Sequence, residues 1–135
     1  MEHELIDIRT IVTEGMGQLS FFEDGVDIPF SIKRVYYTYD VPTGKKRGGH
    51  AHRELLQLLI CPFGKIEVIL NDGAHEKSYL LDDPAKGLLV KNMTWHDMIW
   101  REANSVLMVA ASDHYDESDY IRDYDVFIEC ITSGS

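Results

Sequence analysis

Two histidines separated by a single residue, His50 and His52, have the clearest chemical potential in this chain. They lie in the run RGGHAHRELLQLLICPFG, just ahead of a strand–turn–strand pattern. Side chains two residues apart in an extended segment point to the same side, so both imidazoles can face one cavity. Imidazole titrates near neutral pH and is also a common metal ligand. The pair therefore predicts a site for proton transfer or for metal binding, beside the plainer possibility that both histidines only cap a strand.

The residues after the pair help to separate these interpretations. With Gln57 and Gly64 the pair resembles the first signature of the cupin family of small β-barrels, and His96 falls in a degenerate form of the second signature. In metal-binding cupins a glutamate stands where this chain has Gln57, and a neutral amide is a much poorer metal ligand. We therefore expect no metal and no other cofactor, and we expect the histidines to transfer protons.

The rest of the sequence predicts an all-β fold. Short β-type segments alternate with turn residues, and little of the chain repeats with the helical period. Asn71-Asp72-Gly73 is a strong hairpin signal, because these residues tolerate the positive φ of tight turns. Many short strands at this spacing indicate a sandwich or a barrel. The predicted strands are Leu5–Val12, Gln18–Phe22, Ser31–Tyr39, Leu55–Cys61, Lys65–Leu70, Glu76–Leu81, Gly87–Val90, Met98–Trp100 and Val106–Ala111.

The C-terminal segment from Asp116 to Ile131 has a different pattern. Its apolar residues Ile121, Tyr124 and Ile128 fit one amphipathic helix or helical turn laid on the barrel. Its many acidic residues have a simple interpretation as solvated surface. We therefore place no catalytic group in this segment.

Length, charge and cysteine content limit the class of protein. A chain of 135 residues predicts one domain, residues 1–135, with a single core. The net charge of −10 argues against binding to nucleic acid or to an anionic membrane, since both need a basic face. No segment approaches the ~18–20 apolar residues that span a bilayer, and the N-terminus does not resemble a signal peptide. Cys61 and Cys130 are predicted to be free thiols, which indicates a cytoplasmic protein.

Four segments give a more specific resemblance. IPFSIKRVYYTYD, RGGHAHRELLQLLIC, WHDM and SDHYDESDYIRDYDVF occur in this order, and the similarity extends from about Ile6 to Phe127. Together they resemble the sugar nucleotide 3,4-ketoisomerase family of cupins, which act on dTDP-4-keto-6-deoxy-D-glucose. The resemblance implies a homodimeric, metal-independent jelly-roll barrel, a double-stranded β-helix with a short C-terminal helical segment. It also implies an isomerase that moves the keto group of a dTDP-linked hexose from C4 to C3.

This chemistry needs a base beside the sugar. A proton on the carbon next to a ketone is acidic enough for a positioned base to remove, and the resulting enediol is reprotonated on the other carbon. By the resemblance we predict that His52 takes the C3 proton and returns it at C4, and that His50 orients the substrate or handles oxygen-bound protons. Tyr37 is predicted to hydrogen-bond the developing oxyanion and Tyr39 to contact the substrate. Because Tyr36, Tyr37 and Tyr39 alternate along one strand, the sequence does not tell which of them faces the site.

The nucleotide end of the substrate needs cationic donors. Arg47, just before the Gly48-Gly49 turn, can offer a bidentate fork to phosphate oxygens, and Arg34 is the second candidate. Gln57 and His96 are predicted to contact the sugar.

Two positions bear on the configuration of the product. Ketoisomerases commonly have Arg or Tyr before Gly17, where this chain has Met16, and either His or Arg at the position of His96. This pair tracks the configuration at C4, and His96 favours dTDP-3-keto-6-deoxy-D-galactose, although Met16 fits neither combination. The N-terminal strands from Leu5 to Phe22 can pair with the sheet of a neighbouring subunit, which agrees with a homodimer.

Three other functions remain open from the sequence. The first is a metal-dependent cupin oxygenase or isomerase that uses His50, His52 and His96 as ligands. The second is a dTDP-sugar 3,5-epimerase, which shares the barrel and the base chemistry. The third is a sugar nucleotide-binding module without catalytic activity.

Overall fold

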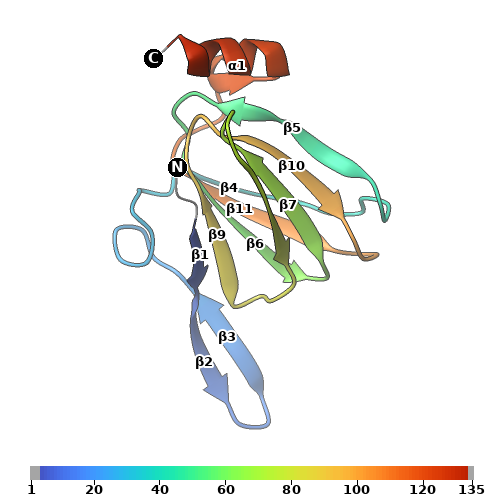
Figure 1. Cartoon of the computed structure of the whole chain (residues 1–135). Helices are drawn as coiled ribbons and strands as arrows, with labels where there is room; N and C mark the ends of the chain where they lie inside the picture. The colour runs from blue at the N-terminus through green and yellow to red at the C-terminus, as the bar shows by residue number, and fades with distance from the viewer. Residues whose placement is uncertain (1–3, 134–135) are drawn as a thin grey trace.

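The computed structural model describes residues 4–133, which form a β-barrel with one C-terminal α-helix (Figure 1). The strands are β1 Glu4–Asp7, β2 Arg9–Thr13, β3 Gly17–Phe21, β4 Arg34–Thr38, β5 Lys46–His52, β6 Gln57–Phe63, β7 Ile66–Asn71, β8 Glu76–Leu81, β9 Lys86–Val90, β10 Trp95–Trp100, β11 Val106–Ala111 and β12 Tyr120–Ile121. The 3₁₀-helix η1 covers Glu117–Asp119, and the α-helix α1 covers Tyr124–Thr132. In this part of the chain no helix is long and apolar enough to cross a membrane.

The barrel is made of two five-stranded antiparallel sheets. One sheet has the order β1-β9-β6-β11-β4, and the other has the order β12-β5-β10-β7-β8. Strands far apart in the sequence are neighbours in both sheets, as expected for a jelly roll. The predicted all-β jelly-roll class is confirmed.

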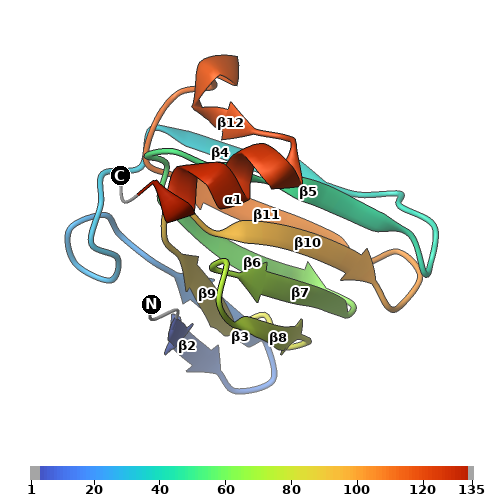
Figure 2. The same cartoon turned by 45° about the horizontal axis from the view of Figure 1, so that its top comes forward.

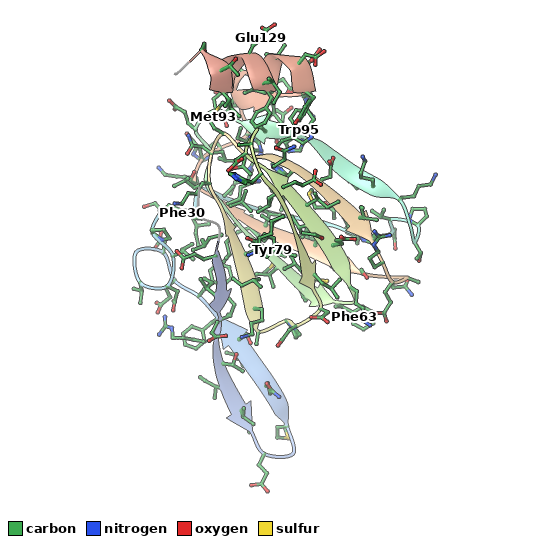
Figure 3. The ribbon with its side chains drawn as sticks, in the orientation of Figure 1. Phe30, Phe63, Tyr79, Met93, Trp95 and Glu129 are labelled. Atoms are coloured by element: carbon green, nitrogen blue, oxygen red, sulfur yellow. The ribbon has the colours of Figure 1, made fainter. Side chains whose placement is uncertain are left out.

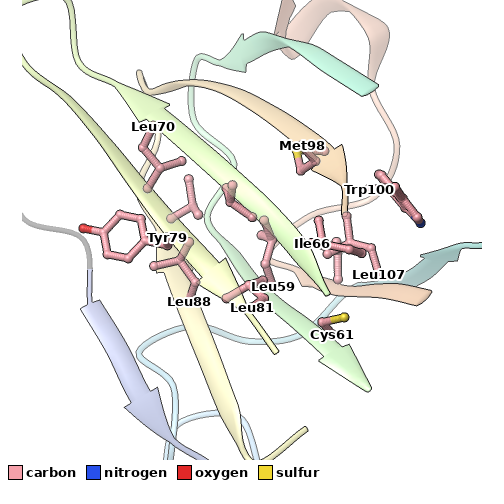
Figure 4. Packing of buried hydrophobic residues seen from close by; sticks show 13 residues of the cluster. Leu59, Cys61, Ile66, Leu70, Tyr79, Leu81, Leu88, Met98, Trp100 and Leu107 are labelled. Carbon is pink, nitrogen blue, oxygen red and sulfur yellow. The ribbon is translucent and has the colours of Figure 1, made fainter. Parts of the chain in front are cut away.

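The main core lies between the two sheets (Figure 4). Strand β7, IEVILN, alternates buried and half-buried residues, because successive side chains of a strand point to opposite faces. Its buried residues Ile66, Val68 and Leu70 meet Leu59 of β6 and Trp100 of β10 in this core. These contacts hold the two sheets together.

A second cluster covers the outer face of the first sheet. Leu58, Ile60 and Ala110 point outward from β6 and β11, and they pack against Ile28 and Ile8 of the N-terminal region. Ile8 is buried, and its backbone N–H donates to the carbonyl of Ala85. This anchor lies between β1, which pairs with β9, and β2, which pairs with β3, so the predicted strand Leu5–Val12 is divided in two.

Helix α1 lies across one end of the barrel (Figure 2). Asp123 caps its N-terminus by accepting hydrogen bonds from the backbone N–H groups of Asp125 and Val126. Phe127 of the helix packs with Ala51 and Ile121 in a third buried cluster. Figure 3 shows Trp95 and Met93 directly under the helix, while Glu129 points away from the barrel.

The hairpin of β2 and β3 projects from the barrel body (Figure 1). It pairs with no other strand in residues 4–133, and its apolar side chains Ile11, Val12 and Leu19 are exposed. Met16 lies in the turn of this hairpin.

The predicted strands agree with the structure unevenly. Glu76–Leu81 and Val106–Ala111 have the predicted bounds, and the other predicted segments overlap observed strands with shifted ends. Strand β5, which carries both histidines, was not among the predicted strands, because its first residues KRGG have low strand propensity. The predicted helix over 116–131 is instead η1, β12 and the shorter helix α1.

The pairing of β5 with β10 positions the histidines. His50 lies opposite His96 in this antiparallel ladder, with a register irregularity directly after His96. Gly48 allows the close approach of the two strands, because an added Cβ would lie 2.8 Å from the backbone oxygen of His96. Gly48 also has φ of 95°, a backbone conformation that favours glycine.

We predict that Gly48→Ala is more destabilising than Gly49→Ala. Gly49 also has positive φ, at 72°, but an added Cβ there meets only the Asp97 side chain at 3.6 Å. The Gly49 variant should lose about 1–2 kcal/mol from backbone strain, and the Gly48 variant should lose roughly 1–3 kcal/mol more from overpacking. Urea unfolding of both variants measures the difference, and equal losses would contradict this account of the β5–β10 contact.

Candidate active site

Three histidines meet at the end of the barrel that α1 covers. His50 and His52 come from β5, and His96 comes from β10. The ring centroid of His50 is 5.1 Å from that of His52 and 4.5 Å from that of His96. His52 and His96 are only 3 % and 2 % exposed. The structure therefore brings together the three histidines that the sequence proposed.

Two of the three rings are held by specific hydrogen bonds. His52 Nδ1 donates to Asp119 Oδ2 at 3.2 Å, and His96 Nδ1 donates to the Thr94 carbonyl at 3.2 Å. His52 Nε2 and His50 Nδ1 are buried and have no hydrogen-bond partner among the described residues. Buried polar atoms are usually satisfied, so such atoms at the end of a cavity are free to interact with a ligand.

Burial keeps the histidines neutral. Removal from solvent is the main cause that lowers the pKa of His50 to about 3, and the neighbouring His96 adds to this effect. Burial and the nearby His50 lower the pKa of His52 to about 4, against the opposing influence of Asp119. A neutral imidazole can accept a proton, so the pair has the protonation state that a base requires.

The opposite wall of the site comes from the first sheet. Tyr36 points into the barrel, and its hydroxyl accepts a hydrogen bond from Gln57 Nε2 at 3.0 Å. Burial raises the pKa of Tyr36 to about 12, so its phenol keeps its proton at neutral pH. The Arg34 guanidinium lies 5.2 Å from the centroid of the Tyr36 ring. This wall places a phenolic O–H and a cation at the same cavity as His50.

That cavity opens to solvent and has a volume of about 330 Å³, which is within the range of small-molecule sites. Arg34, Arg47 and Arg122 all contribute to its lining, together with Tyr115 and Tyr120. The guanidinium groups of Arg34 and Arg47 make this part of an acidic protein locally cationic, which suits a diphosphate, whereas Arg122 is paired with Glu117 at 3.1 Å. The two tyrosine rings offer flat apolar surface beside these cations.

A second, smaller cavity of about 80 Å³ lies beside the first. It is lined by His52 and Asp119, and Tyr120 and Arg34 line both cavities. His50 lines only the larger cavity, and His52 lines only the smaller one. The two histidines are therefore not equivalent in their access to a bound molecule.

Two predicted tyrosines do not lie in the site. Tyr37 and Tyr39 point to the outer face of β4, where they are 65 % and 59 % exposed and stack with ring centroids 5.8 Å apart. Side chains alternate along a strand, so Tyr36 faces inward where Tyr37 faces outward. The predicted catalytic role of Tyr37 and the predicted substrate contact of Tyr39 are corrected on this geometry, and Tyr36 is the tyrosine of β4 at the cavity.

Met16 also lies away from the cavity of its own chain. It is 81 % exposed at the turn of the β2–β3 hairpin. Arg34, Arg47, Gln57 and His96, in contrast, are all at or next to the histidine cluster.

The sequence interpretation missed the contribution of the C-terminal segment. Tyr115, Tyr120 and Arg122 line the cavity, and Asp119 binds His52, although no catalytic group was expected there. Tyr120 reaches the histidines because β12 pairs with β5, which places Tyr120 opposite His52. A two-residue strand has too little pattern to be found by periodicity, and the concentration of Tyr and Arg beside Asp was the only signal.

The three histidines also resemble part of a metal site. His50, His52 and His96 offer nitrogen atoms that all lie within 4.8 Å of one another, which fits three coordination positions of a divalent ion. Within residues 4–133 this group contains no carboxylate, and the Gln57 amide is hydrogen-bonded to Tyr36. The set is therefore neutral and lacks the anionic ligand that offsets a metal's charge.

Comparison with known proteins identifies the family. The family model described as FdtA, WxcM-like, C-terminal, matches residues 1–132. The chain belongs to this family. It is 46% identical over 127 residues to a TDP-4-oxo-6-deoxy-alpha-D-glucose-3,4-oxoisomerase of Aneurinibacillus thermoaerophilus, covering 94% of this chain and 91% of that protein. The family resemblance inferred from the four sequence segments is thereby confirmed.

Solved structures agree with this assignment. A 3,4-ketoisomerase from Helicobacter canadensis has a TM-score of 0.94 and 39% identity, with 98% of each chain covered. QdtA, a sugar 3,4-ketoisomerase from Thermoanaerobacterium thermosaccharolyticum in complex with TDP, has a TM-score of 0.93 and 40% identity, covering 97% of this chain and 95% of that chain. QdtA is also known as a histidine-to-asparagine variant in complex with TDP-4-keto-6-deoxyglucose, and as a double variant at a tyrosine and an arginine.

The histidine pKa values predict a loss of stability in mild acid. Both folded pKa values lie below the ordinary value of 6.5, so the unfolded chain binds protons first as pH falls below 6.5. The stabilisation is complete above pH 6.5 and is lost progressively toward pH 4 and 3, by on the order of 2 kcal/mol per histidine near pH 5. Urea unfolding at pH 7 and pH 5 measures this loss in the wild type and in His50→Asn.

The variant should lose less stability than the wild type between these two pH values. His75→Asn is the matched control, because the His75 side chain is 87% exposed and lies outside the cluster. Equal pH dependence in the wild type and in His50→Asn would contradict the lowered pKa of His50.

Proposed function

We propose that this protein is a TDP-sugar 3,4-ketoisomerase that converts TDP-4-keto-6-deoxyglucose to a TDP-3-keto-6-deoxyhexose. The observation that carries the proposal is the neutral histidine pair His50 and His52 beside a cavity lined by three arginines, in a chain of this family. The histidines supply proton transfer, and the arginines supply a site for the diphosphate. Relatives with the same activity in their names span nearly the whole chain.

The reaction moves two protons. One proton leaves C3 and is delivered to C4, and another leaves the C3 hydroxyl and is delivered to the C4 oxygen. Two neutral imidazoles on one strand can carry these transfers in turn, because each accepts a proton from one atom and gives it to the next. No redox cofactor is needed, since the hydroxyl and keto groups exchange within one molecule.

The structure favours His50 for the carbon-bound proton. His50 is half-buried and lines the 330 Å³ cavity with Tyr36 and Arg47. His52 is more deeply buried, and its Nδ1 is engaged by Asp119. We therefore exchange the roles expected from the sequence, and we give His52 the transfer between the two oxygens.

The wall formed by Tyr36 and Gln57 suits the developing enediolate. Gln57 donates to the Tyr36 hydroxyl, so the phenolic proton is directed away from the amide. A phenol that keeps its proton can donate a hydrogen bond to an oxyanion in a site with little water. Tyr36 thus takes the role that was expected of Tyr37.

The lining arginines suit the nucleotide diphosphate. Arg47 is exposed on β5 shortly before His50, Arg34 begins β4, and Arg122 directly follows β12; all three line the cavity. The rings of Tyr115 and Tyr120 contact each other with centroids 5.7 Å apart and planes tilted by 46°, and they offer aromatic surface to a nucleobase. The sequence had identified no partner for the base.

We also propose that the active form is a homodimer in the cytoplasm. The β2–β3 hairpin exposes an apolar surface and is unpaired with other strands within residues 4–133, and β4 is an edge strand of its sheet. A hairpin added to an exposed edge satisfies both surfaces. If the hairpin pairs with the neighbouring subunit in this way, Met16 can reach the active site of that subunit. Sedimentation of a monomer at micromolar concentration would contradict the dimer.

We propose that the residues at positions 16 and 96 control the configuration of the product. The QdtA double variant changes a tyrosine to arginine and an arginine to histidine, at the same separation along the chain as Met16 and His96. These two positions are therefore the place to look for control of the configuration at C4. His96 favours the galacto product, and product NMR of His96→Arg against the wild type tests this preference.

Three alternative functions make different predictions. A metalloenzyme would retain stoichiometric Fe, Mn or Zn after purification without chelator and would lose activity in EDTA, whereas the ketoisomerase should do neither. A 3,5-epimerase would exchange the proton at C5 with solvent. A binding module without activity would leave TDP-4-keto-6-deoxyglucose unchanged.

The histidine variants test the assignment of roles. His50→Asn should abolish isomerisation and also abolish exchange of the C3 proton with solvent deuterium. His52→Asn should also stop isomerisation, but exchange at C3 should persist, because His50 still removes that proton. Proton NMR of the substrate in D₂O measures both quantities.

Both variants should bind TDP within about twofold of the wild type, because the arginines of the cavity are unchanged; calorimetry measures this affinity. Persistent exchange at C3 in His50→Asn would show that His50 is not the base. Full isomerase activity in both variants would exclude the proposed function.

A further inference from the structure

The Asp119 side chain is held against the end of the histidine strand by several contacts. Its Oδ2 accepts from His52 Nδ1 at 3.2 Å, and its Oδ1 accepts from the backbone N–H of Glu54 at 2.9 Å. Its backbone carbonyl accepts from the N–H of Arg53 at 2.9 Å. The carboxylate is 18 % exposed. Three contacts to three consecutive residues fix both oxygen atoms relative to His52.

The position of Asp119 does not depend on His52 alone. Asp119 ends the 3₁₀-helix η1, where Asp116 caps the first turn by accepting from the Ser118 N–H. The next residues form β12, which pairs with β5 and places Tyr120 opposite His52. Ile121 is then buried under α1. The C-terminal segment therefore delivers a carboxylate to one particular ring nitrogen.

We propose that Asp119 is a positioning residue that fixes the tautomer of His52, with the proton on Nδ1 and the lone pair on Nε2. A carboxylate without a proton only accepts hydrogen bonds, so the nitrogen that faces it must carry the hydrogen. Nε2 is then left as an acceptor, and it is the buried His52 atom that has no partner among the described residues. The catalytic consequence drawn from this geometry rests on the proposed function.

The tautomer determines what His52 can do. Its Nε2 lone pair takes the proton from the C3 hydroxyl, which forms a new N–H bond as the O–H bond breaks. The resulting imidazolium returns that proton to the C4 oxygen, and His52 is neutral again at the end. Asp119 stabilises the transient positive charge on His52. It thereby opposes three effects that disfavour this charge, namely burial of the ring and the proximity of His50 and Arg34.

Asp119→Asn tests this role with almost no change in shape. The amide oxygen can still accept from the Glu54 N–H, but the amide NH₂ then faces His52 and donates to Nδ1. The proton of His52 moves to Nε2, so its lone pair no longer faces the substrate. We expect kcat to fall by about 10²–10⁴-fold, as when a histidine is held in the wrong tautomer, while TDP affinity and KM stay within about twofold.

Asp123→Asn is the matched control, because Asp123 belongs to the same segment but caps α1 and lines neither cavity. It should retain kcat within about twofold. If Asp123→Asn and Asp119→Asn lower kcat to the same degree, Asp119 only holds the segment and the proposal is overturned. A drop in TDP affinity without a drop in kcat would overturn it equally.

The tautomer itself gives a readout that needs no activity. Long-range ¹⁵N–¹H correlation spectra of ¹⁵N-histidine-labelled protein distinguish a protonated Nδ1 from a protonated Nε2, and His52→Asn assigns the signal. The wild type should carry the proton on Nδ1, and Asp119→Asn should carry it on Nε2. A wild-type His52 protonated on Nε2 would refute the proposal even if Asp119→Asn failed to fold. Failure of the proposed function would instead appear as a wild type that does not isomerise the sugar.

Discussion

The pairing of β5 with β10 is the contact on which the site depends. It places His50 opposite His96, and Gly48 permits the close approach at this point. The other edge of β5 is closed by β12, which brings Tyr120 opposite His52. One strand thus receives neighbouring residues of the site from both sides, and a shift by one residue would turn both histidines away from the cavity. The core between the sheets and the packing of α1 against Ala51 of β5 stabilise this register.

Much of the fold could be predicted from the sequence, because the barrel strands follow simple patterns. Glu76–Leu81 and Val106–Ala111 alternate or run apolar between clear turn residues, and their bounds agree with the structure. Strand β5 gave no such signal, since KRGGHAH has little apolar character and takes its shape from its neighbours. The break between β1 and β2 at Ile8 could not be predicted from the local sequence either, because it depends on the burial of Ile8 against residues distant in the chain.

The candidate site divides in the same way. The motif around His50, His52 and Gln57 is local and could be interpreted directly. The inward direction of Tyr36 could not, because the alternating tyrosines do not show which face of the strand points into the barrel. The role of the C-terminal segment depends entirely on a non-local pairing of two residues. Its acidic composition suggested plain surface, yet it supplies Asp119 to His52 and Arg122 to the cavity. Short bridging strands of this kind are where sequence patterns carry least information.

The central claim is that neutral histidines in a cationic cavity transfer a proton from C3 to C4 of a nucleotide-linked keto sugar. The most direct test is to incubate the wild-type protein with TDP-4-keto-6-deoxyglucose in D₂O and to determine by NMR which carbon carries deuterium. We expect a 3-keto product with no deuterium at C5, and with deuterium at C4 to the extent that the base exchanges the abstracted proton with solvent before returning it. Deuterium at C5, or a sugar that is recovered unchanged and undeuterated, would contradict this expectation.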